Sequence, residues 1–292
     1  MERKYFTIKD TAWFCISLYY SRKEWGRLIR EIHLFCDGKK TLLEHYIILL
    51  SEENGEHVRL ALSLSADKDL DAFLQETDDY FRTFMDRFPS SEPEPFRYGK
   101  RIWGNYPNNS IVWNRFELLR LQYIRYVDFS QATSSLLTDF LKDDFSVVNA
   151  FTTALFMCAK TLKTFSEAHN EKAGDLIYHV LKVLAMEVLE QSFVTGFNLN
   201  EKLVLYGIDY AEIMEVIGQY MEYGEEGKTA SGTDTTYRYW ENELKKIAAA
   251  SPDSYLLINR FLWEQFDMND TLKVLIMYLL QEKCSMKSNN SA

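Results

Sequence analysis

The segment at residues 46–64, YIILLSEENGEHVRLALSL, decides the fold of the first half of the chain. Its first five residues are an apolar run typical of a strand, and Glu53-Asn54-Gly55 has the composition of a tight turn. Apolar residues then recur at every second position: Val58, Leu60, Leu62 and Leu64. This alternation is the pattern of a strand with one buried face, so the segment predicts a β-hairpin.

Strand and helix patterns flank this hairpin on both sides. Residues 13–20 are an aromatic and β-branched run that predicts a strand. Ser21 and Glu24 have the spacing of a capping box, which predicts a helix that Gly38 ends. Apolar residues at helical spacing predict a second helix over 69–88. The order strand–helix–strand–strand–helix predicts a ferredoxin-like α+β unit.

The rest of the chain changes from loop to helix. Residues 89–107 contain four of the five prolines and predict a loop, and the aromatic-rich residues 111–129 predict a return to the sheet. No proline lies between Pro107 and Pro252. Helical patterns occupy that interval at 133–142, 146–165, 171–192, 209–223 and 234–249.

These patterns divide the chain into three parts. A ferredoxin-like α+β portion spans 1–130, a helical portion spans 131–286, and a disordered polar tail spans 287–292. The length of 292 residues is within reach of one hydrophobic core, which stops growing at roughly 250–300 residues. We therefore predict one compact α+β unit, with the ferredoxin-like half packed on a largely α-helical half.

The composition predicts a soluble, cytoplasmic protein. The mean hydropathy is -0.28, and no apolar run approaches the ~20 residues that a membrane span needs. No signal-peptide pattern follows Met1, and the four cysteines include no C-x-x-C pair, which fits a reducing compartment. The net charge of -10 disfavours binding to nucleic acid. We therefore expect neither a membrane nor a nucleic acid as a partner.

Standard catalytic motifs are absent from the sequence. There is no P-loop, no dinucleotide-binding glycine pattern, no nucleophile elbow and no histidine pair at zinc-ligand spacing. A basic pair stands out instead, because period two places His57 and Arg59 on the strand face opposite the apolar residues. Arg59 could hold a carboxylate or polarise a peptide carbonyl. The alternative interpretation is an exposed strand face with an ordinary ion pair.

Two further stretches place cations among apolar or aromatic residues. Arg97, Tyr98 and Arg101 lie in the proline-rich loop, where they could bind an acidic segment or pack at the surface. Asn259 and Arg260 lie within an apolar helix, where a buried arginine needs a partner. Structural pairing and substrate binding are both open for these residues.

These stretches together resemble the C-terminal domain of lantibiotic dehydratases, which also exists as a free-standing protein in thiopeptide biosynthesis. That family has an aromatic-rich strand followed by a strand with a His-Leu-Arg-Leu-Arg-like motif, and residues 46–50 and 55–60 stand in those positions. Its Arg-Tyr-Gly-Gly-like motif is matched by residues 97–100, with 123–130 as a competing match. The resemblance spans most of the chain, and no single motif is specific.

The departures from the family pattern bear on the activity. The late helix of the family carries histidines before its Asn-Arg pair, and Tyr255 and Leu257 replace them here. In eliminating members of the family, an acid–base group removes an α-proton so that glutamate leaves a glutamylated Ser or Thr, and a histidine suits that step. A sister branch contains thiopeptide pyridine synthases, which join two dehydroalanines by a formal [4+2] cycloaddition. Loss of water and of the leader peptide then gives a pyridine-centred macrocycle.

From this resemblance we predict a pyridine synthase-like macrocyclase that acts on a precursor peptide with a leader. The resemblance implies catalytic and substrate-binding residues at these positions: Arg59, Tyr255 and His57; Arg97, Tyr98, Arg101, Asn259 and Arg260. Two alternatives are a glutamate-eliminating subunit with a partner that uses glutamyl-tRNA, and a non-catalytic scaffold that binds the leader. No cofactor and no metal are implied. Other enzymes of the same pathway and a second copy of the chain are candidate partners.

Overall fold

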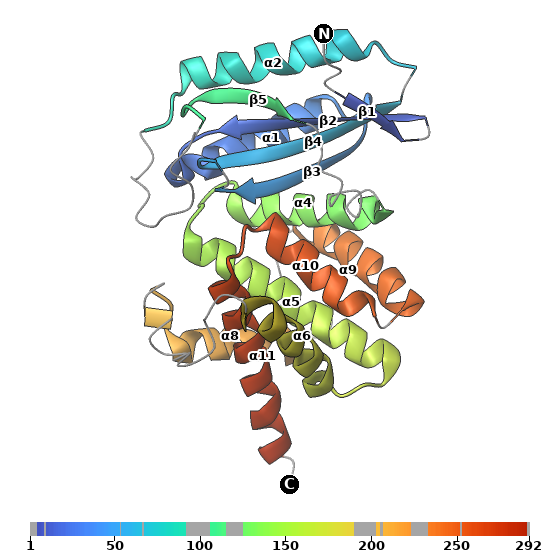
Figure 1. Ribbon diagram of the computed structural model, residues 1–292, viewed down its shortest axis with the longest axis vertical. Helices are drawn as coiled ribbons and strands as arrows, with labels where there is room; N and C mark the ends of the chain where they lie inside the picture. Colours follow the sequence, from blue (N-terminus) through green and yellow to red (C-terminus); the bar gives the residue numbers. More distant parts are fainter. Residues whose placement is uncertain are drawn as a thin grey trace. The chain divides into compact units, whose positions relative to one another are not determined.

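The computed structural model divides the chain into two compact units, Met1–Ser146 and Val147–Ala292. The first unit contains strands and helices and the second is described as helices, so the predicted α+β class is confirmed (Figure 1). The structure describes residues 5–8, 10–52, 54–65, 67–91, 106–114, 125–189, 203–204, 207–222, 233–251 and 253–290.

Among the described residues, the first unit is built around a five-stranded antiparallel sheet. Its strands are β1 (Tyr5–Ile8), β2 (Thr11–Tyr19), β3 (Leu43–Ser51), β4 (His57–Ser65) and β5 (Ser110–Asn114). Strand β4 pairs with β2 on one side and with β3 on the other. Along its second edge, β2 pairs with β1 and then with β5. The order β5–β2–β4–β3 is that of a ferredoxin-like sheet, as the hairpin and its flanking patterns predicted.

Two helices cover one face of this sheet, and an aromatic cluster joins them to it. Helix α1 spans Trp25–Gly38 and helix α2 spans Leu70–Arg87. The ring of Phe14 in β2 lies 5.8 Å from that of Phe73 in α2, and Phe73 lies 6.3 Å from Phe35 in α1. Side chains alternate between the two faces along a strand. The residues of β2 and β4 that alternate with these apolar ones therefore face away from α1 and α2.

The start of α1 differs from the predicted capping box. Ser21 and Glu24 precede and end a short 3-10 turn, η1 (Arg22–Glu24), and neither side chain caps a helix N–H. The Glu24 carboxylate accepts from the backbone N–H of Ser91 at 2.8 Å instead. The predicted capping box is therefore wrong, because a contact distant in sequence takes the carboxylate.

Helix α4 (Val127–Leu141) lies along β3, at the edge of the sheet (Figure 1). The Ser134 hydroxyl accepts from the backbone N–H of Ile48 in β3 at 2.9 Å, which satisfies a donor of the edge strand. The predicted return of residues 111–129 to the sheet holds for β5 and is wrong from Val127 onward, where the chain is helical. The change of structure predicted near residue 131 falls inside α4.

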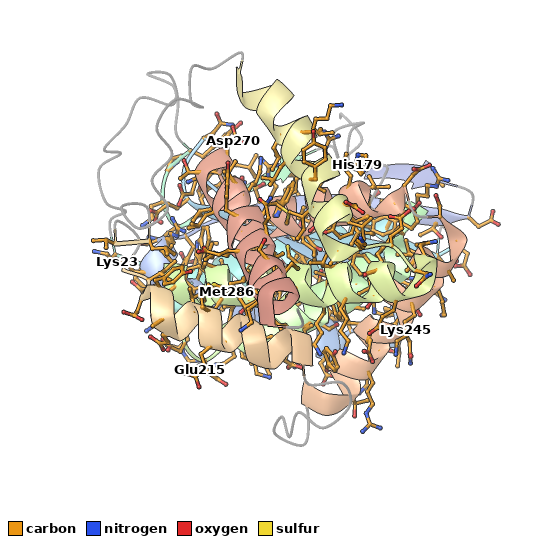
Figure 2. The ribbon with its side chains drawn as sticks, turned by 90° about the horizontal axis from the view of Figure 1, so that it is seen from below. Lys23, His179, Glu215, Lys245, Asp270 and Met286 are labelled. Atoms are coloured by element: carbon orange, nitrogen blue, oxygen red, sulfur yellow. The ribbon has the colours of Figure 1, made fainter. Side chains whose placement is uncertain are left out.

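The second unit consists of helices in its described residues. They are α5 (Val147–His169), α6 (Ala173–Leu189), α8 (Tyr210–Glu222), α9 (Thr233–Ala250), α10 (Ser254–Gln265) and α11 (Asp270–Asn290). Figure 2 shows the ribbon of the chain with its side chains, seen from below, with His179, Glu215, Lys245, Asp270 and Met286 of these helices labelled. Helix α11 extends to Asn290, into the tail predicted to be disordered from residue 287. No described helix is long and apolar enough to span a membrane.

Candidate functional site

The face of the sheet opposite α1 and α2 carries buried polar side chains. The pairing register places Arg59 beside Ser17 of β2, and His57 beside Tyr19 of β2 and Ser51 of β3. Arg59 is 8% exposed and His57 is fully buried. The prediction that His57 and Arg59 share one face is confirmed, and the alternative of an exposed strand face is wrong.

Two hydrogen bonds fix the tautomer of His57. Its Nδ1 lies 2.8 Å from the carbonyl oxygen of Gly55, which only accepts, so Nδ1 carries the proton. The Nε–H of Arg59 donates to Nε2 of His57 at 2.8 Å, so Nε2 carries none. His57 is therefore a neutral imidazole whose lone pair is directed at Arg59. In this tautomer Nδ1 donates to the backbone and Nε2 accepts from the guanidinium, so both ring nitrogens of His57 are engaged within the protein.

A stack of rings leads from the surface to this pair. The ring of Tyr19 lies 4.6 Å from the imidazole of His57, and the ring of Tyr106 lies 4.9 Å from that of Tyr19. Tyr106 is 45% exposed, whereas Tyr19 is 2% exposed. The backbone N–H of Tyr106 donates to the carbonyl of Asn54 at 3.0 Å, which fixes the exposed ring at the hairpin turn. The three rings therefore form a packed column from the exposed Tyr106 to the buried His57.

The turn between β3 and β4 makes this stack possible. Gly55 has a φ of 118°, and a Cβ there would lie 3.4 Å from a ring carbon of Tyr19. An L side chain would therefore strain the backbone and press on the stacked ring. Sequence reasoning found the turn, but it missed Tyr19 and Tyr106, because only the folded sheet brings them to His57.

The other end of the polar face holds a second histidine. His45 Nε2 lies 3.5 Å from a carboxylate oxygen of Asp128, and its Nδ1 lies 3.4 Å from the hydroxyl of Ser63. These distances are at the outer limit of hydrogen bonds, and Ser63 is fully buried. The three groups resemble a nucleophilic triad in composition only, because the serine is not accessible to a substrate.

The predicted residues of the late helix lie in the core of the second unit. Tyr255 in α10 is 3% exposed, and its ring lies 5.5 Å from that of Phe165 in α5. Asn259 is fully buried and donates from its amide to the backbone carbonyl of Tyr255 at 2.8 Å. Burial raises the pKa of the Tyr255 phenol. Arg260 is half-buried on the same helix.

The remaining predicted binding residues are not placed by the structure. Arg97, Tyr98 and Arg101 lie outside the described residues. Within the described part of the chain, no three His, Cys, Asp or Glu side chains come together as a group that could hold a metal ion. The candidate site that the described residues offer is Arg59, hydrogen-bonded to His57, with the ring of Tyr19 stacked on the imidazole.

Comparison with known proteins gives a similarity of fold. No protein-family model and no curated protein matches the chain. A solved structure titled "Pyridine synthase, TbtD, from thiomuracin biosynthesis" matches it with a TM-score of 0.62 and 14% sequence identity. The match covers 94% of this chain and 98% of that chain. At this identity the match shows that the two chains share a fold along nearly their whole lengths.

Proposed function

We propose that the chain is a maturation enzyme for a ribosomally synthesised, thiopeptide-type precursor peptide. Its reaction is a formal [4+2] cycloaddition of two dehydroalanines, after which loss of water and of the leader peptide gives a pyridine-centred macrocycle. The observation that carries the proposal is the fold shared with a pyridine synthase along 94% of the chain. The buried and oriented guanidinium of Arg59 supports it independently.

Arg59 is suited to the step that starts the reaction. One dehydroalanine must react as a diene, which requires the adjoining amide to take an iminol-like form. A guanidinium that stays protonated and donates to the amide oxygen stabilises that form, and such donors act most strongly where water is excluded. His57 orients the guanidinium by accepting from the Nε–H of Arg59. The remaining rate enhancement comes from holding the two alkenes close together.

The tautomer of His57 favours cycloaddition over glutamate elimination. Elimination needs a base for the α-proton, and the only lone pair of a neutral imidazole here accepts from Arg59 at 2.8 Å. Elimination stays the second candidate, because a buried guanidinium would also bind the carboxylate of a leaving glutamate. A scaffold that binds the leader without chemistry is the third.

The test is mass spectrometry of precursor peptides incubated with the purified chain. We expect a dehydrated, azole-bearing precursor to lose its leader and yield a pyridine-containing macrocycle. Glutamate loss from a glutamylated precursor would establish elimination instead. Equal binding of unmodified and dehydrated precursors, with no change in mass of any of them, would leave the scaffold as the function.

The Arg59→Ala variant tests the site within the same assay. We expect turnover to fall by about 100-fold to 1,000-fold, as on removal of a donor to a developing oxyanion. Arg30→Ala is the matched control, because Arg30 is an exposed arginine of α1 that pairs with Asp143 at 3.1 Å. Normal turnover in a folded Arg59→Ala protein would remove Arg59 from the mechanism.

A further inference from the structure

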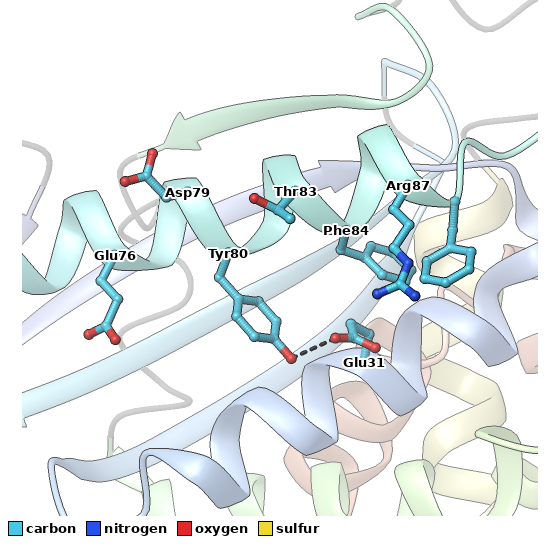
Figure 3. Close-up of a pocket in the computed structure, with 8 residues that line it drawn as sticks. Glu31, Glu76, Asp79, Tyr80, Thr83, Phe84 and Arg87 are labelled. Carbon is cyan, nitrogen blue, oxygen red and sulfur yellow. Dashed lines mark hydrogen bonds between the residues drawn. The ribbon is translucent and has the colours of Figure 1, made fainter.

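A groove lies between α1 and α2 on the first unit. Its volume is about 370 Å³, near the lower end of the range of binding pockets, roughly 300–1,000 Å³. The residues that line it include Glu31, Glu76, Tyr80, Phe84, Arg87 and Phe88. Figure 3 shows Tyr80 reaching from α2 toward Glu31 on α1, with Glu76 and Arg87 to either side along α2. None of these residues takes part in the site around Arg59.

The floor of the groove is aromatic. Phe84 is 6% exposed, and Phe88 at the end of the groove is 41% exposed. The guanidinium groups of Arg87 and Arg27 lie 5.1 Å and 5.9 Å from the centre of the Phe88 ring. Two guanidinium groups of this chain already lie over the ring, so the floor offers a ligand apolar area.

The rim of the groove carries three carboxylates, of Glu31, Glu76 and Asp79, against one guanidinium, of Arg87. The Tyr80 hydroxyl donates to a carboxylate oxygen of Glu31 at 2.5 Å, which leaves the negative charge of Glu31 without a cation at that contact. Asp79 accepts from the neutral amide of Gln75 at 3.0 Å. Glu76 differs, because it pairs with Lys39. The Glu31 contact also contributes, after burial, to the raised pKa of Tyr80.

The charge of α2 indicates what kind of partner the groove can take. The helix carries five acidic residues against two arginines. This balance repels phosphate-rich ligands and attracts cations. A cationic side chain would meet Glu31, and Asp79, which points to the other side of α2, adds a second charge to the lining (Figure 3). A neighbouring aromatic or aliphatic side chain would cover Phe84 and Phe88. A peptide presents both kinds of side chain a few ångströms apart.

We propose that the groove between α1 and α2 binds a peptide segment that carries a basic side chain next to an aromatic or aliphatic one. This binding site is separate from the residues that carry the proposed function. It can therefore be tested by binding alone, with no turnover, and its failure leaves the proposed cycloaddition untouched.

The probe is the fluorescein-labelled peptide Gly-Arg-Phe-Arg-Leu-Gly, titrated with the full-length chain and followed by fluorescence anisotropy. We expect it to bind more tightly than the same peptide with both arginines replaced by glutamates. Added salt should weaken the binding, because the charges on the rim are partly exposed. Equal affinity for the two peptides, or no binding of either, would overturn the proposal.

Paired variants localise the binding to the groove. Glu31→Gln keeps an acceptor for Tyr80 and removes the charge, and Asp79→Asn removes the second charge. Together they should weaken binding of the arginine peptide about fivefold, the size expected for partly exposed ion pairs. Asp86→Asn is the matched control, because Asp86 lies exposed on the same helix outside the groove. An equal effect of Asp86→Asn would mean that only the overall charge of α2 matters.

Discussion

At the scale of single residues, His57 can be distinguished from a general base by how it responds to substitution. The Gln side chain can present an oxygen to the Nε–H of Arg59, where His57 now presents Nε2 at 2.8 Å, whereas Ala cannot. We therefore expect His57→Gln to keep a substantial part of the cyclase turnover and His57→Ala to lose most of it. The measurement is kcat on the dehydrated precursor for both variants.

The pH dependence of the cyclase turnover is a second test of the role of His57. If Nε2 of His57 were protonated, it could no longer accept from the Nε–H of Arg59, and this hydrogen bond would be lost. The turnover of the wild type should therefore fall at acidic pH. The fall should be absent in His57→Gln, whose amide does not titrate. A Gln variant as inactive as the Ala variant would mean that the imidazole itself transfers a proton, which would support elimination.

The free energy of unfolding and the turnover of a Tyr255→Phe variant together distinguish a structural role of Tyr255 from a catalytic one. Its hydroxyl is buried, its polar neighbour is the side chain of Asn259, and no hydrogen bond of good geometry joins the hydroxyl to a described residue. Removing such a hydroxyl relieves a desolvation cost of roughly 1–3 kcal/mol. We therefore expect Tyr255→Phe to leave turnover unchanged and to keep or raise the free energy of unfolding, measured in urea. A large loss of turnover in a folded variant would restore Tyr255 to the site.

The pKa of Tyr255 adds a pH dependence with a definite sign. Burial raises this pKa above the ordinary tyrosine value of 10.0, so at alkaline pH the unfolded phenol loses its proton while the folded one keeps it. The stability that the phenol contributes is thus present below about pH 10 and is lost as the pH rises further. Between neutral and strongly alkaline pH, Tyr255→Phe should lose less stability than the wild type.

At the scale of elements, local patterns predicted the sheet and its hairpin because those signals are contained in a few adjacent residues. The alternation from Val58 to Leu64 is enough to assign β4. The predicted capping box failed because Glu24 instead accepts from the backbone of Ser91, a contact between residues 67 positions apart. Residues 127–129 were misassigned for a related reason. They belong to the aromatic-rich stretch 111–129, whose composition suits a strand, and in the fold they begin a helix along β3.

The contacts of the candidate site likewise include some that the sequence predicts and others that only the fold shows. Period two along one strand is sufficient to pair His57 with Arg59. Tyr19 joins them only through the register of β2 on β4, and Tyr106 joins only through its stacking on Tyr19. No pattern in the sequence predicts either contact. The late-helix match to the family located Tyr255 and could not show that the helix turns this residue into the core.

At the scale of the whole molecule, the division between Ser146 and Val147 makes a prediction about fragments. A chain ending at Ser146 keeps α4 and the hydrogen bond from Ile48 to Ser134. A chain ending at Ser130, the boundary that the sequence predicted, loses three fully buried leucines of α4: Leu136, Leu137 and Leu141. Burial of each contributes about 1.5–3 kcal/mol, and together they rival the total stability of a domain, about 5–15 kcal/mol.

We therefore expect the fragment 1–146 to be monomeric and to unfold cooperatively, as followed by circular dichroism and size-exclusion chromatography. The fragment 1–130 should aggregate, because the edge of β3 is then an unpaired strand that a second chain can join. Equal stability of the two fragments would mean that α4 contributes nothing to the first unit. If neither fragment folded, the first unit would depend on the second, as the prediction of one compact unit from the sequence requires.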